Sequence, residues 1–214
     1  MEVVSTNPWV QSPQRDPERG EGEPAPSPPV TRVTPVLPAV GPGASAVSAP
    51  ARAFPRRSVE ATGPPVALWW VGVHGGAGES TLEQLLEGSR ANGHAWPHIE
   101  EPTTARPPVI LVARTSARGL RAAQLAATEW AAGNVPVQLH GLVLVADAPG
   151  RLPKPLRDFA QVVGGGVPRV WRLPWVEAWR VGEPVSPETT PKAVADFLED
   201  VRSSYIAPNS LSHP

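Results

Sequence analysis

The chain has 214 residues, in which 19 Lys and Arg are balanced by 20 Asp and Glu, and it contains no Cys. The near-neutral charge excludes a strongly basic nucleic-acid coat and a polybasic membrane tether, so direct nucleic-acid binding is not expected. The absence of Cys excludes a disulfide framework, a thiol nucleophile and Cys-based metal sites. No apolar run approaches the ~20 residues that cross a bilayer, and the acidic start lacks signal-peptide features. We therefore expect a cytoplasmic protein without a membrane span.

The N-terminal part of the chain is rich in proline. Of the 29 Pro, 14 lie in residues 1–65, a segment that holds only two aromatic residues. Such a segment cannot bury enough apolar surface to offset its ordering entropy. The sequence predicts a disordered Pro-rich arm over residues 1–64, a folded domain over 65–206 and a flexible tail over 207–214. We interpret the arm as a semi-rigid spacer, with a partner-docking segment of the PxxP type as the alternative.

The folded part alternates continuous apolar runs, which predict buried strands, with amphipathic segments, which predict helices. In chain order we expect a strand at 66–73, a helix at 80–87, an irregular stretch at 93–108, a strand at 109–113, a helix at 116–132, a strand at 137–146, a helix at 153–163, a strand at 167–173, a helical turn at 174–180 and a helix at 192–204. Strands that alternate with helices form parallel βαβ units. The predicted fold class is an α/β sandwich with a mainly parallel sheet.

The most informative stretch is a glycine loop, Val73-His-Gly-Gly-Ala-Gly-Glu-Ser-Thr-Leu82, placed where the first strand becomes a helix. Backbone N–H groups converge in such a loop and the helix dipole favours negative charge, so the loop can cradle an anion. The candidate phosphate-binding residues are Gly75, Gly76, Ala77, Gly78, Glu79, Ser80 and Thr81. We expect the glycines to provide positive φ angles or a close approach of loop and helix.

The loop departs from the ordinary phosphate-loop pattern, because Val73 stands where the first glycine belongs. It resembles the KGGxGK(S/T) variant found in the ParA/MinD group of dimeric ATPases. The three glycines match that variant, as do Ser80 and Thr81 at the hydroxyl positions. His74 stands at the signature lysine, and Glu79 replaces the phosphate-loop lysine.

Later segments are similar to the C-terminal half of the same family, so the resemblance covers residues 66–204. The matching segments are Val109–Val112, Ser116–Ala132, Leu142–Val145, Asp147 near the base-reading Asn, Leu173-Pro174 and Gly182–Val185. The resemblance implies a reduced P-loop NTPase-like sandwich. No hydrophobic run ending in Asp occurs in residues 83–108, so the family's switch Asp and metal-strand Asp lack counterparts there. A shortened sheet is expected.

Glu79 decides what the loop is expected to do. At an effective dielectric constant near 20, a unit charge ~4 Å from a phosphate contributes roughly 4 kcal/mol. Replacing attraction by Lys with repulsion by Glu removes about 8 kcal/mol, which is comparable to a micromolar binding energy. We therefore expect a pseudo-ATPase without enzymatic activity and without a cofactor. ATP and magnesium are the alternative.

These features predict a non-catalytic interaction or scaffold protein that binds a protein partner or forms a homodimer. ParA/MinD proteins serve DNA partitioning, transfer and positioning, so the resemblance implies an accessory role in plasmid partitioning or conjugative transfer. The preference for Arg over Lys is typical of a GC-rich bacterial genome. The alternative function is an ATP-, nucleotide- or phosphate-binding switch of ParA/MinD type. Such a switch would use the loop amides with His74 or with an arginine supplied by a partner chain.

Other polar and aromatic residues allow both structural and functional interpretations. His94 and His98 have metal-ligand spacing, but Pro97 between them disfavours a regular helix, so no metal site is expected. Asp147 is expected to form an Asp-Ala-Pro-Gly turn rather than to hold magnesium. His140 is expected to pack in its strand. For Trp171, Trp175 and Trp179, with Trp69 and Trp70, the alternatives are core or rim packing and an exposed partner surface.

Overall fold

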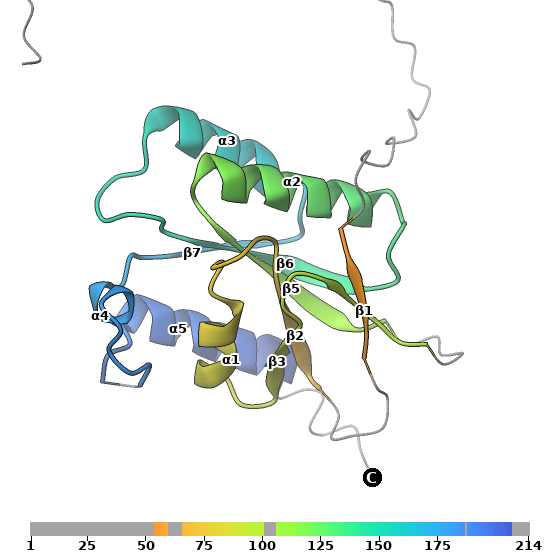
Figure 1. Cartoon of the computed structure of the whole chain (residues 1–214), viewed down its shortest axis with the longest axis horizontal. Coiled ribbons are helices and arrows are strands. Elements are labelled where there is room, and N and C mark those ends of the chain that lie inside the picture. The colour runs from red at the N-terminus through yellow and green to blue at the C-terminus, as the bar shows by residue number, and fades with distance from the viewer. Residues whose placement is uncertain (1–53, 60–65, 101–105, 187, 207–214) are drawn as a thin grey trace, which may run out of the picture. The chain divides into compact units, whose positions relative to one another are not determined.

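A parallel sheet forms the centre of the domain (Figure 1). A computed structural model describes residues 54–59, 66–100, 106–186 and 188–206. Within these residues, five strands lie in the order β3-β2-β5-β6-β7, and every neighbouring pair is parallel. The strands are β2 (Leu68–Gly72), β3 (Ser89–Ala91), β5 (Pro108–Arg114), β6 (Gln138–Val145) and β7 (Val170–Leu173). The α/β class and the mainly parallel sheet predicted from the sequence are confirmed.

Helices cover both faces of this sheet (Figure 1). One face carries α2 (Ala117–Ala131) and α3 (Lys154–Gly164), and the other carries α1 (Glu79–Leu85) and α5 (Lys192–Val201). A short helix, α4 (Glu177–Arg180), follows β7. The single helix predicted over 192–204 is wrong in its last turn, because α5 ends at Val201 and a π-helical segment, Arg202–Ile206, follows. No helix in the described residues is long and apolar enough to cross a bilayer.

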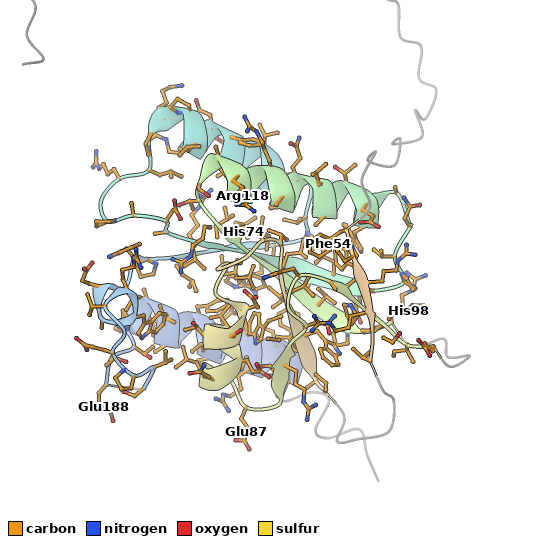
Figure 2. All side chains as sticks on the ribbon, in the orientation of Figure 1. Phe54, His74, Glu87, His98, Arg118 and Glu188 are labelled. Carbon is orange, nitrogen blue, oxygen red and sulfur yellow. The ribbon has the colours of Figure 1, made fainter. Side chains whose placement is uncertain are left out.

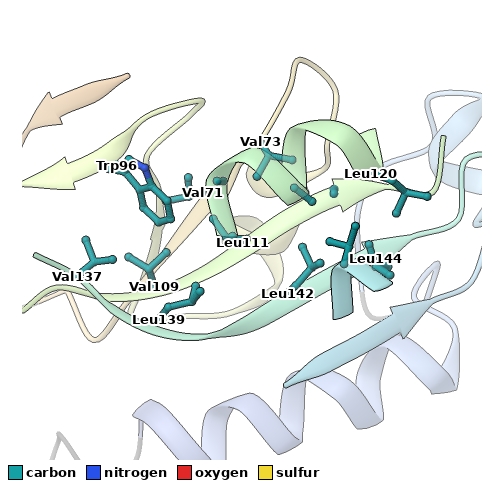
Figure 3. Close-up of a cluster of buried hydrophobic side chains, with 14 of the residues drawn as sticks. Val71, Val73, Trp96, Val109, Leu111, Leu120, Val137, Leu139, Leu142 and Leu144 are labelled. Atoms are coloured by element: carbon teal, nitrogen blue, oxygen red, sulfur yellow. The ribbon is translucent and has the colours of Figure 1, made fainter. Parts of the chain in front are cut away.

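The face beneath α2 and α3 is closed by apolar side chains from the middle of the sheet (Figure 3). Val71, Leu111 and Leu142 come from neighbouring strands and are fully buried. They belong to one cluster with Leu120 of α2 and Ala160 of α3. Burying a Val or Leu side chain contributes roughly 1.5–3 kcal/mol, so this cluster fixes both helices to the sheet.

Successive strand residues point to opposite faces of the sheet. The strand residues that alternate with Val71, Leu111 and Leu142 therefore form a second cluster, on the face covered by α1 and α5. Trp70, Ile110 and Val143 are fully buried there, and Phe197 of α5 packs against them. The indole N–H of Trp70 donates to Ser89 Oγ at 2.8 Å, which joins β2 to β3 inside the core. Continuous apolar runs in β2, β5 and β6 are therefore explained by burial on both faces.

A two-stranded sheet joins the first described residues to the domain. β1 (Arg56–Ser58) pairs in parallel with β4 (Trp96–His98). Phe54 packs edge-on against Trp96, with ring centroids 5.8 Å apart. The buried carboxylate of Glu129 in α2 accepts from the Phe54 backbone N–H at 2.8 Å and from the Trp96 indole N–H at 3.2 Å. This carboxylate therefore fixes β1 and β4 to α2.

Two sequence-based expectations are corrected by these elements. Residues 54–59 were expected to belong to a disordered arm, but they are bonded to the domain through β1 and Glu129. The stretch 93–108, expected to be irregular, contains β4. The sequence analysis predicted no strand for Ser89–Ala91, where β3 forms one edge of the five-stranded sheet. The rest of the predicted arm, apart from residues 54–59, and the predicted tail at 207–214 lie outside the described residues.

The strand order creates a crevice at the carboxyl ends of two neighbouring strands, β2 and β5. The chain passes from β2 to β3 on one side and then crosses to β5 on the other side of β2. The helices that follow β2 and β5, α1 and α2, therefore cover opposite faces. In open α/β sheets, ligands bind outside the carboxyl ends of the strands at this kind of switch point. The carboxyl ends of β2 and β5 are therefore the place to search for a ligand site.

Candidate ligand site at the carboxyl edge of the sheet

The glycine loop lies at this crevice and connects β2 to α1, as the sequence predicted. Gly76 and Gly78 have φ angles of 75° and 112°, a left-handed conformation that favours glycine. The expectation that the loop needs its glycines is confirmed at these two positions. It is wrong for Gly75, where φ is not positive and an added Cβ would come only within 3.9 Å of His94 Nε2.

The remaining candidate loop residues differ in how deeply they are buried. Ala77 is buried in the core beside α1, Ser80 is exposed, and Thr81 is half-buried. Glu79 is the first residue of α1 and is also buried. The sequence analysis placed its carboxylate toward the phosphate position, and the structure places it elsewhere.

The Glu79 side chain turns back beneath the loop onto the end of β2. Its Oε2 accepts a hydrogen bond from the Gly78 backbone N–H at 3.1 Å, and its Oε1 lies 3.5 Å from His94 Nδ1. Its carboxyl group lies so close to Gly72 that a Cβ added there would be 2.5 Å from Glu79 Cδ. A loop amide is therefore bonded to the chain's own carboxylate, and the direct repulsion assumed from the sequence does not describe this arrangement.

His74, at the signature-lysine position, is held within the chain by both ring nitrogens. Nε2 accepts from the Arg114 backbone N–H at 3.0 Å, so the proton of the neutral ring is on Nδ1, which donates to the Gly75 carbonyl at 2.9 Å. A Cβ on Gly119 of α2 would lie 2.8 Å from Nε2, so the ring also packs closely on α2. His74 thus connects the glycine loop to the ends of β5 and α2.

Arg114, the last residue of β5, connects the glycine loop to the residue that follows β6. Its Nε donates to the Gly76 carbonyl at 3.1 Å, and its Nη1 donates to the Ala146 carbonyl, just after β6, at 3.0 Å. Burial of the guanidinium lowers the pKa of Arg114, nearby Asp147 opposes this, and nearby Arg180 adds to it. Arg114 is therefore a positioned, half-buried cation that is incompletely compensated by negative charge.

A cavity of about 480 Å³ opens beside this arginine. Its described lining combines the loop, the end of β5, the start of α2, the end of β6 and the segment after β7; the residues are His74, Gly75, Gly76, Arg114, Ser116, Arg118, Asp147, Trp175 and Arg180. Figure 2 labels Arg118 on α2 and His74 below it, and both residues line this cavity. Among these described lining residues, Asp147 is the single acidic side chain against three arginines.

A second cavity, of about 210 Å³, shares Arg114, Trp175 and Arg180 with the first. Its other described lining residues are mostly apolar: Gly78, Thr81, Leu82, Val145, Leu173, Pro174, Val176 and Trp179. Glu79 is absent from the described lining of both cavities. At the carboxyl ends of the strands, the cavity lined by three arginines thus adjoins a smaller, mostly apolar cavity.

Asp147 follows β6 in an exposed turn, and its backbone N–H donates to Thr115 Oγ1 at 3.1 Å. It also lines a further cavity of about 330 Å³ formed largely by the 146–153 loop, to which α3 contributes Leu156. The prediction of a turn is consistent with this position. No three His, Asp or Glu side chains gather as a metal site in the described part of the chain.

The remaining candidate histidines and tryptophans lie in different parts of the structure. His94 Nδ1 lies 3.1 Å from the Gly72 carbonyl, whereas His98 belongs to β4 in the small sheet. His140 stacks on Tyr205, with ring centroids 4.2 Å apart. Among the tryptophans of the series, Trp171 is in the core, and Trp175 and Trp179 line cavities. The structural interpretation is therefore confirmed for Trp171.

The sequence analysis missed the arginines of the large cavity. Arg114, Arg118 and Arg180 come from β5, α2 and α4, so no local motif contains all three. Arg114 alone carried a local signal, because it directly follows the buried apolar run Val109–Ala113. The convergence of the other two depends on tertiary structure.

A family model described as a family of unknown function (DUF6668) matches residues 66–198. The chain belongs to this family. The matched range contains the whole five-stranded sheet and all residues named above as cavity lining. No curated protein and no solved structure gives a significant match to the chain.

Proposed function

We propose that this chain is a non-catalytic P-loop-like domain, of the ParA/MinD type, that acts by binding rather than by hydrolysing a nucleotide. Its role is that of an interaction or scaffold protein with a protein partner or a second copy as its target. The process that the loop resemblance favours is plasmid partitioning or conjugative transfer. The five-stranded parallel sheet with a glycine loop between its first strand and helix supports this architecture.

The observation that carries the proposal is the hydrogen bond from the Gly78 N–H to the Glu79 carboxylate. An active phosphate loop offers its backbone amides and a lysine to the phosphates. Here a glutamate stands at the lysine position, is buried, and accepts from a loop amide. The loop therefore lacks the cation that catalysis of phosphoryl transfer requires and uses one amide internally.

The test is an ATP hydrolysis assay on the full chain with magnesium, compared with Ser80→Ala. Ser80 is exposed and occupies the magnesium-binding hydroxyl position of the motif, so its removal abolishes genuine loop-dependent turnover without disturbing the core. We expect phosphate release at the buffer rate from both proteins. Release by the wild type that exceeds the buffer rate and is lost in Ser80→Ala contradicts the proposal.

A second candidate is a nucleotide-binding switch, and one observation favours it. The cavity of about 210 Å³ adjoins Gly78 and Thr81 of the loop and has two tryptophans in its lining. Calorimetric titration with ATP separates the candidates. Magnesium-dependent binding that Ser80→Ala weakens at least tenfold supports the switch, whereas absent or magnesium-independent binding supports the first proposal.

A further inference from the structure

We propose that the cavity lined by Arg114, Arg118 and Arg180 binds a phosphate or pyrophosphate group. The site is distinct from the amide that Glu79 occupies in the glycine loop. The inference goes beyond the proposed binding function, which requires no small anionic ligand.

The first argument is the convergence of charge. Three arginines from separate elements line one cavity of about 480 Å³, and Asp147 is the single acidic residue among its described lining residues. Guanidinium groups present planar sets of N–H donors that match phosphate oxygens, often in bidentate pairs. Asp147 can neutralise one of the three positive charges, so a ligand with two negative charges would neutralise the other two.

The second argument is the state of Arg114 itself. Its side chain is fixed by hydrogen bonds to the Gly76 and Ala146 carbonyls, and a guanidinium has five N–H donors, so it can keep these bonds and still donate to a ligand. Burial and the proximity of Arg180 both disfavour its charge. An anion placed between Arg114 and Arg180 would offset both costs.

The third argument is that the surrounding groups are suited to an anion. Ser116, whose Oγ accepts from the Gly119 backbone N–H at the start of α2 and whose hydroxyl keeps its own proton to donate, lines the cavity together with the exposed Gly75 and Gly76. The cavity also shares Trp175 with the apolar hollow, so a phosphate can be either free or attached to an organic group that extends there. Both sources share the same chemistry at the arginines.

The experiment is calorimetric titration of the full chain with inorganic pyrophosphate, without magnesium and at constant ionic strength. Arg114 has structural hydrogen bonds, so the test variant is Arg118→Gln combined with Arg180→Gln, both at exposed positions. The charge-matched control combines Arg121→Gln with Arg157→Gln, two exposed arginines of α2 and α3 that are not among the described lining residues.

We expect the wild type and the control to bind pyrophosphate equally and the test variant to bind at least tenfold more weakly. Absence of binding to the wild type at millimolar pyrophosphate overturns the proposal. Equal binding by the test variant and the control also overturns it, because the cavity arginines would then contribute no more to binding than arginines elsewhere on the surface.

Competition between pyrophosphate and magnesium-free ATP identifies the source of the phosphate. At least tenfold tighter binding of ATP indicates an organic phosphate, and equal or weaker binding indicates that the phosphate group alone is recognised; either result supports the site. Failure of the proposed function has a different signature, since Ser80-dependent ATP turnover contradicts that function and leaves the comparison of the arginine variants unchanged.

Discussion

His74 Nε2 accepts a hydrogen bond from the Arg114 backbone N–H at 3.0 Å. The bond crosses the switch point of the sheet, because His74 follows β2 and Arg114 ends β5. The guanidinium of the same arginine donates back to the Gly76 carbonyl in the loop. Two hydrogen bonds therefore connect the glycine loop to Arg114, which lines the cationic cavity.

The first prediction concerns Gly119, over which the His74 ring packs. Helix propensity alone predicts that Gly119→Ala in α2 stabilises by about 1 kcal/mol. The added Cβ would instead lie 2.2 Å from the Arg114 carbonyl oxygen and 2.8 Å from His74 Nε2. Since backbone cannot move aside cheaply, we expect a net loss of about 1–3 kcal/mol in urea denaturation.

The control for this prediction is Gly165→Ala at the end of α3. Gly165 has helical angles, φ −69° and ψ −15°, and an added Cβ there meets its nearest atom at 3.4 Å. This variant should be neutral or slightly stabilised. Equal behaviour of the two variants would contradict the close contact between His74, Arg114 and α2.

The second prediction concerns Gly72, against which the Glu79 carboxylate packs. In Gly72→Ala the new Cβ would meet Glu79 Cδ at 2.5 Å, so the side chain must leave its place and the Gly78 amide loses its partner. We expect a loss of about 1–3 kcal/mol in unfolding free energy. In a Glu79→Ala background the same Gly72 substitution should cost much less, and additive losses in this double-mutant cycle would contradict the contact.

The third prediction concerns Glu129, the buried carboxylate that fixes β1 and β4 to α2. Glu129→Ala leaves the Phe54 N–H and the Trp96 indole N–H without this acceptor, which should cost about 2–5 kcal/mol and expose residues 54–59 to protease. Glu129→Gln keeps an acceptor oxygen and loses the 3.9 Å ion pair with half-exposed Arg56, so it should remain close to wild type. Unchanged proteolysis near residue 56 in Glu129→Ala would show that β1 is held by other contacts.

The fourth prediction concerns pH. Burial lowers the pKa of His140, which stacks on Tyr205. The unfolded chain therefore takes up this proton first, and folding stability should fall as pH decreases below about 6.5 toward the lower pKa of the folded state. His140→Phe keeps an aromatic ring and removes this contribution. Urea midpoints at pH 7.5 and 5.5 should differ more for the wild type than for the variant, and an equal difference would exclude His140 as the cause.

Much of the fold followed from local pattern. The apolar runs of β2, β5 and β6 predicted buried strands because both faces of these strands are covered. β3 carries no such run, since it consists of Ser89, Arg90 and Ala91, and its pairing with β2 is fixed by tertiary contacts such as the Trp70–Ser89 hydrogen bond. β4 contains Pro97, which disfavours a strand in any sequence-based analysis but is tolerated in a small two-stranded sheet.

The candidate site was predictable only in part. The position of the glycine loop and the need for glycine at Gly76 and Gly78 followed from the sequence. The direction of the Glu79 side chain did not, because it depends on the space above Gly72 and on His94, 22 residues beyond Gly72 in the chain. The cationic cavity could not be predicted from the sequence either, because its arginines come together only when β5, α2 and α4 pack in the folded domain.

The amide of Gly78 gives the most direct test of the central claim that this loop is closed on its own carboxylate. Its ¹H–¹⁵N resonance should be recorded in the full chain during titration with magnesium and ATP, and again in Glu79→Gln. We predict that the resonance shifts on the Glu79 substitution, because its acceptor changes, and that nucleotide with magnesium causes no saturable shift in the wild type. A saturable, magnesium-dependent shift of Gly78 in the wild type would contradict the account, because the loop amide would then receive a phosphate.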